Sequence, residues 1–549
     1  MKLERFGLLL WLFLSCLRAD SATLRYVNAG NLMPTPPYTN WATAASVIQD
    51  AVDAAGIDDQ ILVTNGLYAT GGRIAGAGLL TNRVALDKRV TLRSVNGPVL
   101  TIIQGWQVPG TTNGDAAIRC VYLDSQATLI GFMLTNGATR NGNVVSAADH
   151  SGGGAWCDST HPLITNCIVI GNSAATEGGG IYGGTLDDCL VSGNVNGGAR
   201  ASSLKSCTIT GNSGNAAGGV TQCQLTDCVL MNNSGVGGGA ASDCVLNHCI
   251  LVGNSASSFG GGAYSSTLLA CSVIGNSSAG QGGGAWGGSL NNCLVNGNSA
   301  LRGGGAAESS LTNCTVVGNR AAEAGGVWMG YVANSIIYYN TAALRVDNHQ
   351  AESVSFCCTT PLPAQGSGNI TNEPLFVNLV PGDFSLQTNS PCINSGNNSY
   401  VTTATDLQGD PRIQGGTVDI GAFELQKPAS VIAYAWLKQY GLASDGSADF
   451  ADADGDGMNN RQEWLAGTDP TSNLSALKME APSIEGSQVA LYWQSEPNRI
   501  YFIQKGTSLA ATSRFEIIAT NICGKLGTTS YVDTNLPGAG FSFYRIGVQ

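Results

Sequence analysis

Charged side chains are scarce in this chain of 549 residues, in which Asp, Glu, Lys and Arg together make up 12%, about half their usual share. Lysine is almost absent from the middle, where Lys205 is the only one between Lys88 and Lys427. The formal net charge is -12. A nucleic-acid partner requires a basic face, so we expect none. The balance suits an acidic extracellular protein better.

Long apolar runs are also missing, apart from a short one at the N-terminus. Two basic residues precede an apolar stretch from Phe6 to Leu14, and small residues follow at Ala19 and Ala22. This order is typical of a secretory signal peptide, which we assign to residues 1–22. The run is too short to span a bilayer, so we predict no transmembrane segment. We expect a monomer that is secreted or held at a bacterial cell surface.

Glycine, by contrast, is abundant at 74 residues, and cysteine recurs at regular intervals. From Cys167 the steps are 22, 18, 21, 21, 22, 22, 21 and 21 residues, with Ser335 in the ninth place. The cysteines of this column are Cys167, Cys189, Cys207, Cys228, Cys249, Cys271, Cys293 and Cys314. Such a period is typical of stacked repeats, in which each unit buries its apolar face against its neighbours.

Three other columns keep a constant spacing from the cysteine. An apolar residue stands three positions before it, from Ile164 to Val332, and Val, Ile or Leu stands two positions after it. Asparagine stands five positions after it, from Asn172 to Asn340. Side chains alternate along a strand, so the cysteine and the residue two later face the same side. The odd spacing of the earlier apolar column predicts a corner or bulge before the cysteine.

Leucine-rich repeats and parallel β-helices both have such a period. The segment LDDCLVSGN at 186–194 fits the leucine-rich pattern, but the leucine expected after the asparagine is absent. The rest of each unit contains phrases such as GGGIY and GGGAW, and glycine costs a helix about 1 kcal/mol per residue. We therefore predict an all-β fold, a right-handed parallel β-helix, over residues 23–425.

Stacking strands about 4.8 Å apart makes each column a ladder of like side chains. A ladder of Lys or Glu would repel itself, whereas stacked Asn amides hydrogen-bond from turn to turn. Cysteines fill a narrow interior as small apolar residues, and parallel stacking holds their Cβ atoms too far apart for disulfides. Better candidates for oxidation are Cys223 with Cys244 and Cys357 with Cys358, whose disulfide state the sequence leaves open.

Both ends of the coil require a cap, because a bare end is an unpaired edge. The segment NWATAASVIQDAVDAAG predicts a helix from Trp41 to Ala55, with Asn40 as its N-cap and Gly56 as its stop. At the other end, charge concentrates at 389–424 and predicts a salt-bridged cap. Its charged residues are Asp406, Asp410, Arg412, Asp419 and Glu424.

The predicted helix, VTLRSVNG at 90–97 and CIVIGNSAATEGGGIY at 167–182 resemble the pectin-lyase-like superfamily of right-handed β-helices. The GNSA and GGG phrases are similar to the chlamydial polymorphic outer membrane protein repeat. The segment at 389–424 resembles the choice-of-anchor Q segment of bacterial surface β-helices. The resemblance covers residues 23–425 and implies the fold. Enzymes of this fold are often lyases or hydrolases of acidic polysaccharides.

The segment DADGDGMNNRQE at 452–463 matches the calcium loop of an EF-hand at every position. Ca²⁺ takes six to eight oxygens, and Gly457 permits the sharp turn that the loop requires. The predicted ligands are Asp452, Asp454, Asp456, the Met458 carbonyl, Asn460 and Glu463. IAYAWLKQYGL and RQEWLAG predict the flanking helices. This region, 428–475, resembles dockerin and thrombospondin type 3 modules. A second loop is missing, so we predict a rigid spacer.

After residue 482, five short segments alternate as strands do. They are QVALYWQS, RIYFIQKG, RFEIIATN, TSYVDTN and FSFYRIGVQ. We predict a small β-sandwich at 482–549, similar to fibronectin-type appendages of exported bacterial proteins.

Four aromatic residues share a column, each four positions before the apolar column: Tyr182, Tyr264, Trp286 and Trp328. Two interpretations are open: the rings stack on sugars, or they pack under neighbouring turns.

Catalytic residues are not assigned. The acids of the middle region are scattered, and the polygalacturonase motifs N-T-D, G-H-G and R-I-K are absent. A lyase would require a base beside clustered carboxylates. We predict a carbohydrate-binding, adhesin-like protein whose partner is a polysaccharide or cell-surface glycan. The alternative is a polysaccharide lyase or glycoside hydrolase of acidic polysaccharides.

Overall fold

The computed structural model describes residues 22–548, except 125, 142–145, 346, 381, 486–487, 498, 509–513 and 536–540. The predicted signal peptide, apart from its last residue, lies outside the described residues. Within the described ranges, no helix has the length and apolar character needed to cross a membrane.

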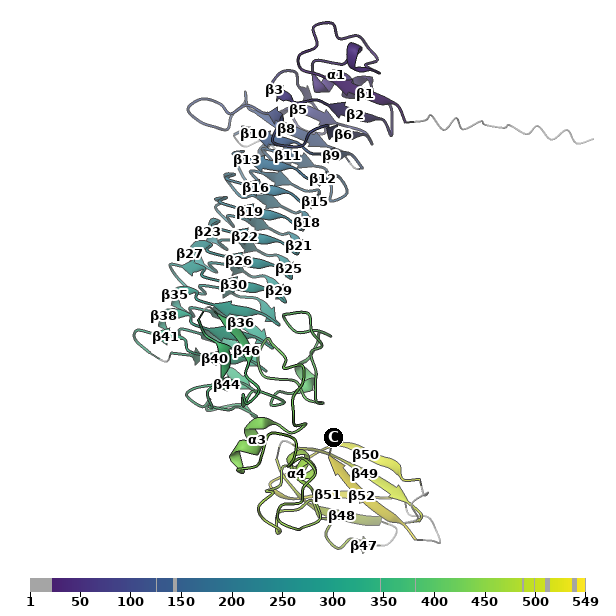
Figure 1. The fold of residues 1–549 in the computed structure, drawn as a ribbon, viewed down its shortest axis with the longest axis vertical. Helices are drawn as coiled ribbons and strands as arrows, with labels where there is room; N and C mark the ends of the chain where they lie inside the picture. Colours follow the sequence, from purple (N-terminus) through teal and green to yellow (C-terminus); the bar gives the residue numbers. More distant parts are fainter. Residues whose placement is uncertain are drawn as a thin grey trace, which may run out of the picture. The chain divides into compact units, whose positions relative to one another are not determined.

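The chain forms two compact units, one of residues 22–175 with Ile181–Cys189 and one of Thr176–Gly180 with residues 190–548. In both units, short strands pair in parallel with the strands one turn earlier and later, as Figure 1 shows. Parallel crossovers of this kind are right-handed. The predicted all-β class and right-handed parallel β-helix are confirmed.

The first unit has two faces of stacked strands. One face holds β1 (Leu24–Val27), β2 (Gln60–Val63), β6 (Thr91–Ser94), β9 (Thr128–Ile130), β12 (Leu163–Thr165) and β15 (Thr185–Asp187). Beside them lie β5 (Thr81–Leu86), β8 (Ile118–Leu123), β11 (Ala155–Cys157) and β14 (Ile181–Tyr182), with β4 (Arg73–Ile74) antiparallel to β5. The second face holds β3 (Gly66–Tyr68), β7 (Thr101–Gln104), β10 (Met133–Thr135) and β13 (Ile168–Ile170). A short helix, α2 (Ala147–His150), lies in a loop.

The predicted helix from Trp41 to Ala55 is wrong as one element. The chain forms a 3₁₀ turn, η1 (Trp41–Thr43), and then α1 (Ile48–Ala54). Between them Ala45 pairs with the edge of β1, because its N–H donates to the Tyr26 carbonyl at 2.9 Å and its carbonyl accepts from Asn28 N–H at 2.8 Å. Pairing with the open sheet edge therefore interrupts the helix that the sequence pattern predicts.

The second unit has three faces. The first holds β17 (Ala199–Arg200), β20 (Val220–Thr221), β24 (Ala241–Ser242), β28 (Ala263–Tyr264), β32 (Ala285–Trp286), β18 (Ser203–Lys205), β21 (Gln224–Thr226), β25 (Val245–Asn247), β29 (Thr267–Leu269), β33 (Ser289–Asn291), β36 (Ala306–Thr312), β39 (Val327–Ala333), β42 (His349–Gln350) and β43 (Ser353–Ser355). The second holds β16 (Leu190–Ser192), β19 (Thr208–Thr210), β22 (Val229–Met231), β26 (Ile250–Val252), β30 (Ser272–Ile274), β34 (Leu294–Asn296), β37 (Thr315–Val317), β40 (Ile336–Tyr338) and β44 (Cys358–Thr359). The third holds β23 (Ser234–Gly237), β27 (Ser255–Phe259), β31 (Ser277–Ser278), β35 (Ser299–Arg302), β38 (Arg320–Glu323) and β41 (Thr341–Ala342).

The asparagine column forms the predicted ladder. In the second unit, each Nδ2 donates to Oδ1 of the asparagine one turn later, at 2.8–3.0 Å from Asn212 to Asn340. The same oxygen also accepts the backbone N–H of the preceding asparagine. These side chains are at most 4% exposed. The ladder therefore satisfies a row of backbone groups at a buried corner.

The predicted corner before each cysteine is also present. The residue directly before the cysteine is left-handed in both units, for example at Asn166 (φ 50°), Asp227 (φ 55°) and Asn313 (φ 53°). Asn and Asp tolerate this conformation better than most residues. The cysteines of the column are buried, and all described cysteines are free thiols, including Cys223 and Cys244.

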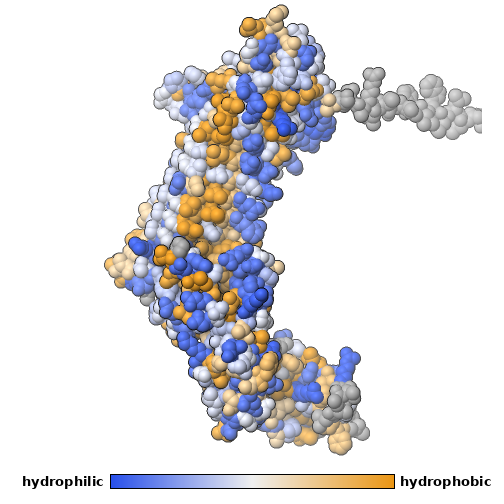
Figure 2. Space-filling model, viewed as in Figure 1, coloured by the Kyte–Doolittle hydropathy of each residue, from blue (hydrophilic) through white to orange (hydrophobic). Residues whose placement is uncertain are grey.

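The outer surface reflects the low charge of the sequence. On the face drawn in Figure 2, white and orange surface covers much of the middle turns of the second unit, and blue gathers along the margin near β21, β25 and β29. An ion pair joins two adjacent turns, with Arg302 Nε 3.2 Å from Glu323 Oε2.

The charged segment at 389–424 contains the predicted salt bridge. Arg412 Nη1 lies 3.0 Å from Glu424 Oε2, and both side chains are almost fully buried. Burial raises the pKa of Asp419 to about 7 and that of Glu424 to about 8, although Arg412 opposes both shifts. Backbone N–H groups of Asn394 and Leu425 donate to Asp419. Asp410 is exposed and takes no part in the ion pair.

The same segment lies against the last turns of the coil. Asn292, Asn313 and Asn334, three successive corner residues, donate side-chain hydrogen bonds to Thr403 and to the carbonyls of Tyr400 and Asn397. It contains η2 (Asn398–Tyr400) and follows the hairpin of β45 (Phe376–Asn378) and β46 (Asp383–Leu386).

The C-terminal elements agree with the sequence pattern. Helices α3 (Tyr434–Gln439) and α4 (Asn460–Ala466) flank the acidic loop. All five predicted strands are present, as β48 (Gln488–Ser495), β49 (Ile500–Gly506), β50 (Glu516–Cys523), β51 (Gly527–Asp533) and β52 (Phe543–Val548). With β47 (Ser483–Glu485), which the sequence pattern missed, they form two three-stranded antiparallel sheets around Trp493, Tyr501 and Ile503. This is the predicted small sandwich.

We expect Asn254→Ala to destabilise the coil by about 3 kcal/mol, because the backbone N–H of Asn233 and one of the two hydrogen bonds of its side-chain amide lose their acceptor in a buried site. Chemical denaturation followed by circular dichroism measures the change. The control is Gln224→Ala, an exposed strand residue, with an expected cost of about 0.5 kcal/mol or less. Equal costs for the two variants would show that the ladder contributes nothing.

We expect Arg412→Met to cost about 3–5 kcal/mol, because it leaves buried carboxylates without their cation. Arg302→Met removes a partly exposed partner and is expected to cost about 1 kcal/mol or less. The two variants are compared by thermal and chemical unfolding. A small effect of Arg412→Met would contradict the assignment of the pair as the centre of the cap.

Candidate metal site and aromatic clusters

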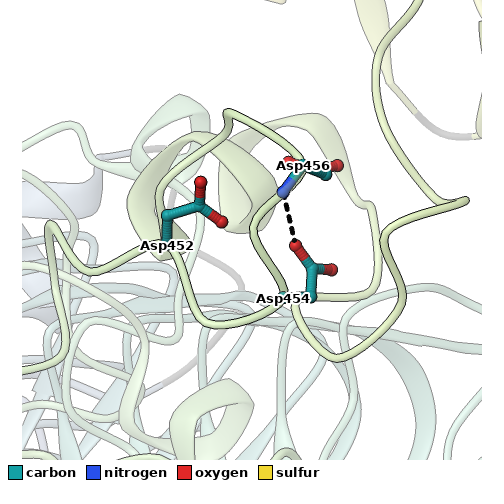
Figure 3. A group of neighbouring side chains, drawn as sticks. All are labelled: Asp452, Asp454 and Asp456. Carbon is teal, nitrogen blue, oxygen red and sulfur yellow. Dashed lines mark hydrogen bonds between the residues drawn. The ribbon is translucent and has the colours of Figure 1, made fainter.

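The acidic loop between α3 and α4 brings three carboxylates together. One oxygen from each of Asp452, Asp454 and Asp456 lies within 4.8 Å of the other two, and Figure 3 shows their arrangement along the loop. Gly455 and Gly457, at φ 78° and 97°, allow the turns between them. Among the described residues, this is the only such group of three potential metal-binding side chains.

Helix α4 supplies two further oxygens. Its N-cap is Asn459, which forms a capping box with Gln462. This start places Asn460 and Glu463 in the first turn, and both side chains are fully buried. Asn460 Nδ2 donates to the Ala448 carbonyl at 2.8 Å. The side-chain oxygen of Asn460 is therefore available to coordinate a cation.

Four oxygens of this group are buried with no hydrogen-bond partner among the described residues: Asp454 Oδ2, Asp456 Oδ2, Asn460 Oδ1 and Glu463 Oε2. Burying unpaired carboxylate oxygens is costly. No described Lys, Arg or His forms an ion pair with them. Burial, followed by repulsion from Asp454 and Asp456, raises the pKa of Glu463 to about 7.

These residues fit a hard cation with oxygen ligands, and Ca²⁺ is the cation for which this spacing is typical. A bound Ca²⁺ would satisfy the four orphaned oxygens and remove the repulsion. Met458, whose carbonyl is the remaining predicted ligand, lies in the loop with its N–H donating to Asp456 at 2.7 Å. The acidic triad thus agrees with the metal prediction, and the identity of the ion stays a prediction.

The aromatic column forms one cluster in the first unit. Tyr122, Trp156 and Tyr182 are register neighbours on β8, β11 and β14. The Trp156 and Tyr182 rings stack with centroids 4.3 Å apart and 8° between planes. Tyr122 and Trp156 precede the first aligned cysteine, so the aromatic column predicted from the repeat does not include them. The phrase GGGAW at 152–156, which recurs at 282–286, is the signal that would have found Trp156.

A second cluster lies in the second unit and consists of Phe259, Tyr264 and Trp286. Tyr264 and Trp286 stack at 5.0 Å with 14° between planes. Phe259 is 38% exposed and contacts both rings, at centroid distances of 6.4 and 5.1 Å. Tyr264 and Trp286 are half-buried. We call these three residues the Tyr264 cluster.

One face of the Tyr264 ring is bordered by small residues. Trp286 stacks on the side of the following turn, so the other face points toward Ser242, its register neighbour on the preceding turn. Gly237 lies beside the same ring, because a Cβ atom at this glycine would be 3.5 Å from Tyr264 Cδ2. A larger residue at either position would cover the ring.

Trp328 differs from the other three predicted ligand residues. It is 8% exposed, packs with Ala307 and Ala324, and lies under the Arg302 guanidinium at 5.4 Å from the ring centroid. This corresponds to the packing interpretation, so Trp328 is not part of the candidate ligand site.

Asp149 and His150 of the first unit have structural surroundings. Asp149 is buried and accepts the backbone N–H groups of Leu79 and Leu80. His150 is also buried, with Nδ1 3.1 Å from the Arg140 carbonyl oxygen. Both side chains are therefore packed and hydrogen-bonded within the first unit.

No protein-family model matches the chain, and no curated protein matches it. Among solved structures it is similar to pectate lyase Pel9A, with 13% identity, a TM-score of 0.34, and 74% of this chain and 97% of that chain covered. It is also similar to XylC in complex with xylose, with 9% identity, a TM-score of 0.38 and coverage of 74% and 99%. A tailspike protein gp49 of Acinetobacter baumannii bacteriophage Fri1, a capsular polysaccharide depolymerase, aligns with 6% identity, a TM-score of 0.28 and coverage of 96% and 88%. At such scores these likenesses say nothing about chemistry here.

We expect Ca²⁺ to raise the unfolding temperature, because a ligand at a hundredfold excess over its Kd contributes about 2.7 kcal/mol. Glu463→Gln should abolish the shift, since it removes a carboxylate of the site. The control is Asp445→Asn, which removes an exposed acid outside the loop. The measurement is thermal unfolding with and without added Ca²⁺ after chelator treatment. A shift that persists in Glu463→Gln would place the ion elsewhere.

Proposed function

We propose that this protein is secreted or displayed at a cell surface and binds carbohydrate through the Tyr264 cluster. The observation that carries the proposal is the half-buried Tyr264 ring, which has a stacking partner on one face only. Flat aromatic surfaces with polar edges suit the faces of pyranose rings. The Gln281 side chain, which accepts the Trp286 Nε1–H at 3.1 Å, supplies a polar edge.

The acidic loop is proposed to hold a structural Ca²⁺. Extracellular calcium modules bind in the millimolar to submillimolar range, which suits a site that is loaded outside the cell. In this role the ion stiffens the segment between the coil and the sandwich. It takes no part in ligand chemistry.

Polysaccharide cleavage is the alternative function. A lyase requires a base beside clustered carboxylates, and a glycoside hydrolase commonly requires a pair of carboxylates that flank the scissile bond. In the coil turns that the structure describes for the second unit, the ion pairs are Arg200 with Glu177 and Arg302 with Glu323, each with a single acid. This arrangement supports binding over cleavage, and both activities are measured in one experiment.

The test is a glycan array, followed by titration of the best ligand into wild type, Tyr264→Ala and Gly237→Leu. Tyr264→Ala should weaken binding about tenfold, the loss expected for one aromatic contact. Gly237→Leu should weaken binding as much, because the new side chain would cover the Tyr264 ring. The substitution should be tolerated by the fold, since the backbone of Gly237 is not left-handed and a Cβ atom there would make ordinary van der Waals contacts. Gly30→Leu, the same change on an exposed turn of the first unit, is the control and should leave binding unchanged.

The same preparations are tested for cleavage of acidic polysaccharides by the absorbance of unsaturated uronates and by reducing ends. Binding that survives both Tyr264→Ala and Gly237→Leu would reject the Tyr264 cluster. Turnover of a polymer would reject the binding function in favour of the enzyme.

A further inference from the structure

The first unit contains an exposed carboxylate that neutral donors hold beside an aromatic stack. Asp158 follows β11 directly and is exposed. Its Oδ1 accepts the Trp156 Nε1–H at 2.9 Å, and its Oδ2 accepts the Tyr122 hydroxyl. Trp156 joins this carboxylate to the half-buried Tyr182, because its ring stacks on Tyr182 at 4.3 Å.

Hydrogen bonds hold the Asp158 carboxylate in place, but no ion pair among the described residues neutralises its charge. Neither donor carries a charge, and no described Lys, Arg or His forms an ion pair with Asp158. Arg119 lies 5.7 Å from the centroid of the Trp156 ring, but its hydrogen bonds go to Asn82 and to the backbone carbonyls of Ala148, Ser151 and Gly152. The negative charge of Asp158 therefore remains available to a ligand.

The position of Asp158 comes from an insertion in the repeat. Trp156 pairs with Tyr182, and Leu163 pairs with Thr185. Six residues lie between Trp156 and Leu163, whereas only two lie between Tyr182 and Thr185 on the next turn. The inserted loop is tied to the next turn. The Ser159 and Pro162 carbonyls accept backbone N–H groups at 2.7 and 2.8 Å, and the Thr160 carbonyl accepts the Thr185 hydroxyl at 2.7 Å. Loops added to a regular scaffold are a common place for binding residues.

Burial, together with the hydrogen bond to Asp158, raises the pKa of Tyr122 above its ordinary value. The phenol thus stays a hydrogen-bond donor throughout the physiological range. It holds Asp158 in place and brings no competing charge.

We propose that Asp158 and the Tyr182 ring form a binding site for a saccharide that carries free amino groups. An ammonium group gains a charge-assisted hydrogen bond from the fixed carboxylate and attraction from the negative face of the aromatic ring nearby. An N-acetylated sugar keeps only the stacking contact. A uronate is repelled by Asp158. The site lies in the first unit and does not involve the Tyr264 cluster, so the two proposals stand or fall separately.

The experiment measures binding of three oligosaccharides of equal length to the full secreted chain: oligomers of glucosamine, N-acetylglucosamine and galacturonate. Calorimetric titration at about 0.15 M salt limits the contribution of distant charges. Wild type should bind the glucosamine oligomer at least tenfold more tightly than the acetylated one, and the galacturonate oligomer least. Equal affinities for the three oligomers, or a preference for the uronate, would overturn the proposal without any variant.

Variants then locate the site. Asp158→Asn keeps an oxygen that accepts a hydrogen bond from the indole or the phenol but removes the negative charge. Its affinity for the glucosamine oligomer should fall at least tenfold, and its affinity for the acetylated oligomer should not change. Tyr182→Ala should weaken both. Asp50→Asn, an exposed acid on α1 with the same change in net charge, is the control and should bind as wild type does. Equal losses in Asp50→Asn and Asp158→Asn would show that only the overall negative charge attracts the amine.

Discussion

The rest of the structure depends on in-register stacking of like residues, because each strand hydrogen-bonds to the same position one turn away. Every column, buried or exposed, must therefore tolerate its own copies about 4.8 Å apart. Asparagine does so best, since each amide both donates and accepts along the column, as between Asn254 and Asn276. Charges do not, and the one pair of opposite charges in register on the third face, Arg302 and Glu323, shows the exception that the rule allows.

The same constraint decides where ligand sites can arise. A column offers aromatic stacks such as Tyr264 on Trp286, but the stacked rings cover one another. One face of the Tyr264 ring has a small residue as its register neighbour, Ser242, and no described aromatic ring stacks on it. An unpaired carboxylate that two neutral donors hold beside an aromatic stack lies where an insertion leaves the repeat, at Asp158. Both proposed ligand sites therefore lie where the regular stacking of like residues is interrupted.

The acidic loop follows a different logic. Its ligand spacing is local, so twelve consecutive residues specify it almost completely. The structure adds the burial of Asn460 and Glu463 and the four oxygens that no protein donor satisfies. Sequence spacing indicates calcium, and the uncompensated oxygens supply the physical reason for a cation.

The amino-acid sequence by itself determined the period, the buried columns, the corner before each cysteine, the five strands of the sandwich and the helices beside the acidic loop, since all of these follow from local alternation and spacing. Only the tertiary structure decided that Ala45 pairs with β1 and splits the predicted helix, that Trp328 is buried, and that Tyr122 meets Asp158 from 36 residues away. Those outcomes depend on which residues of different turns come into contact. A local sequence pattern carries no information about contacts between residues that are far apart in the chain.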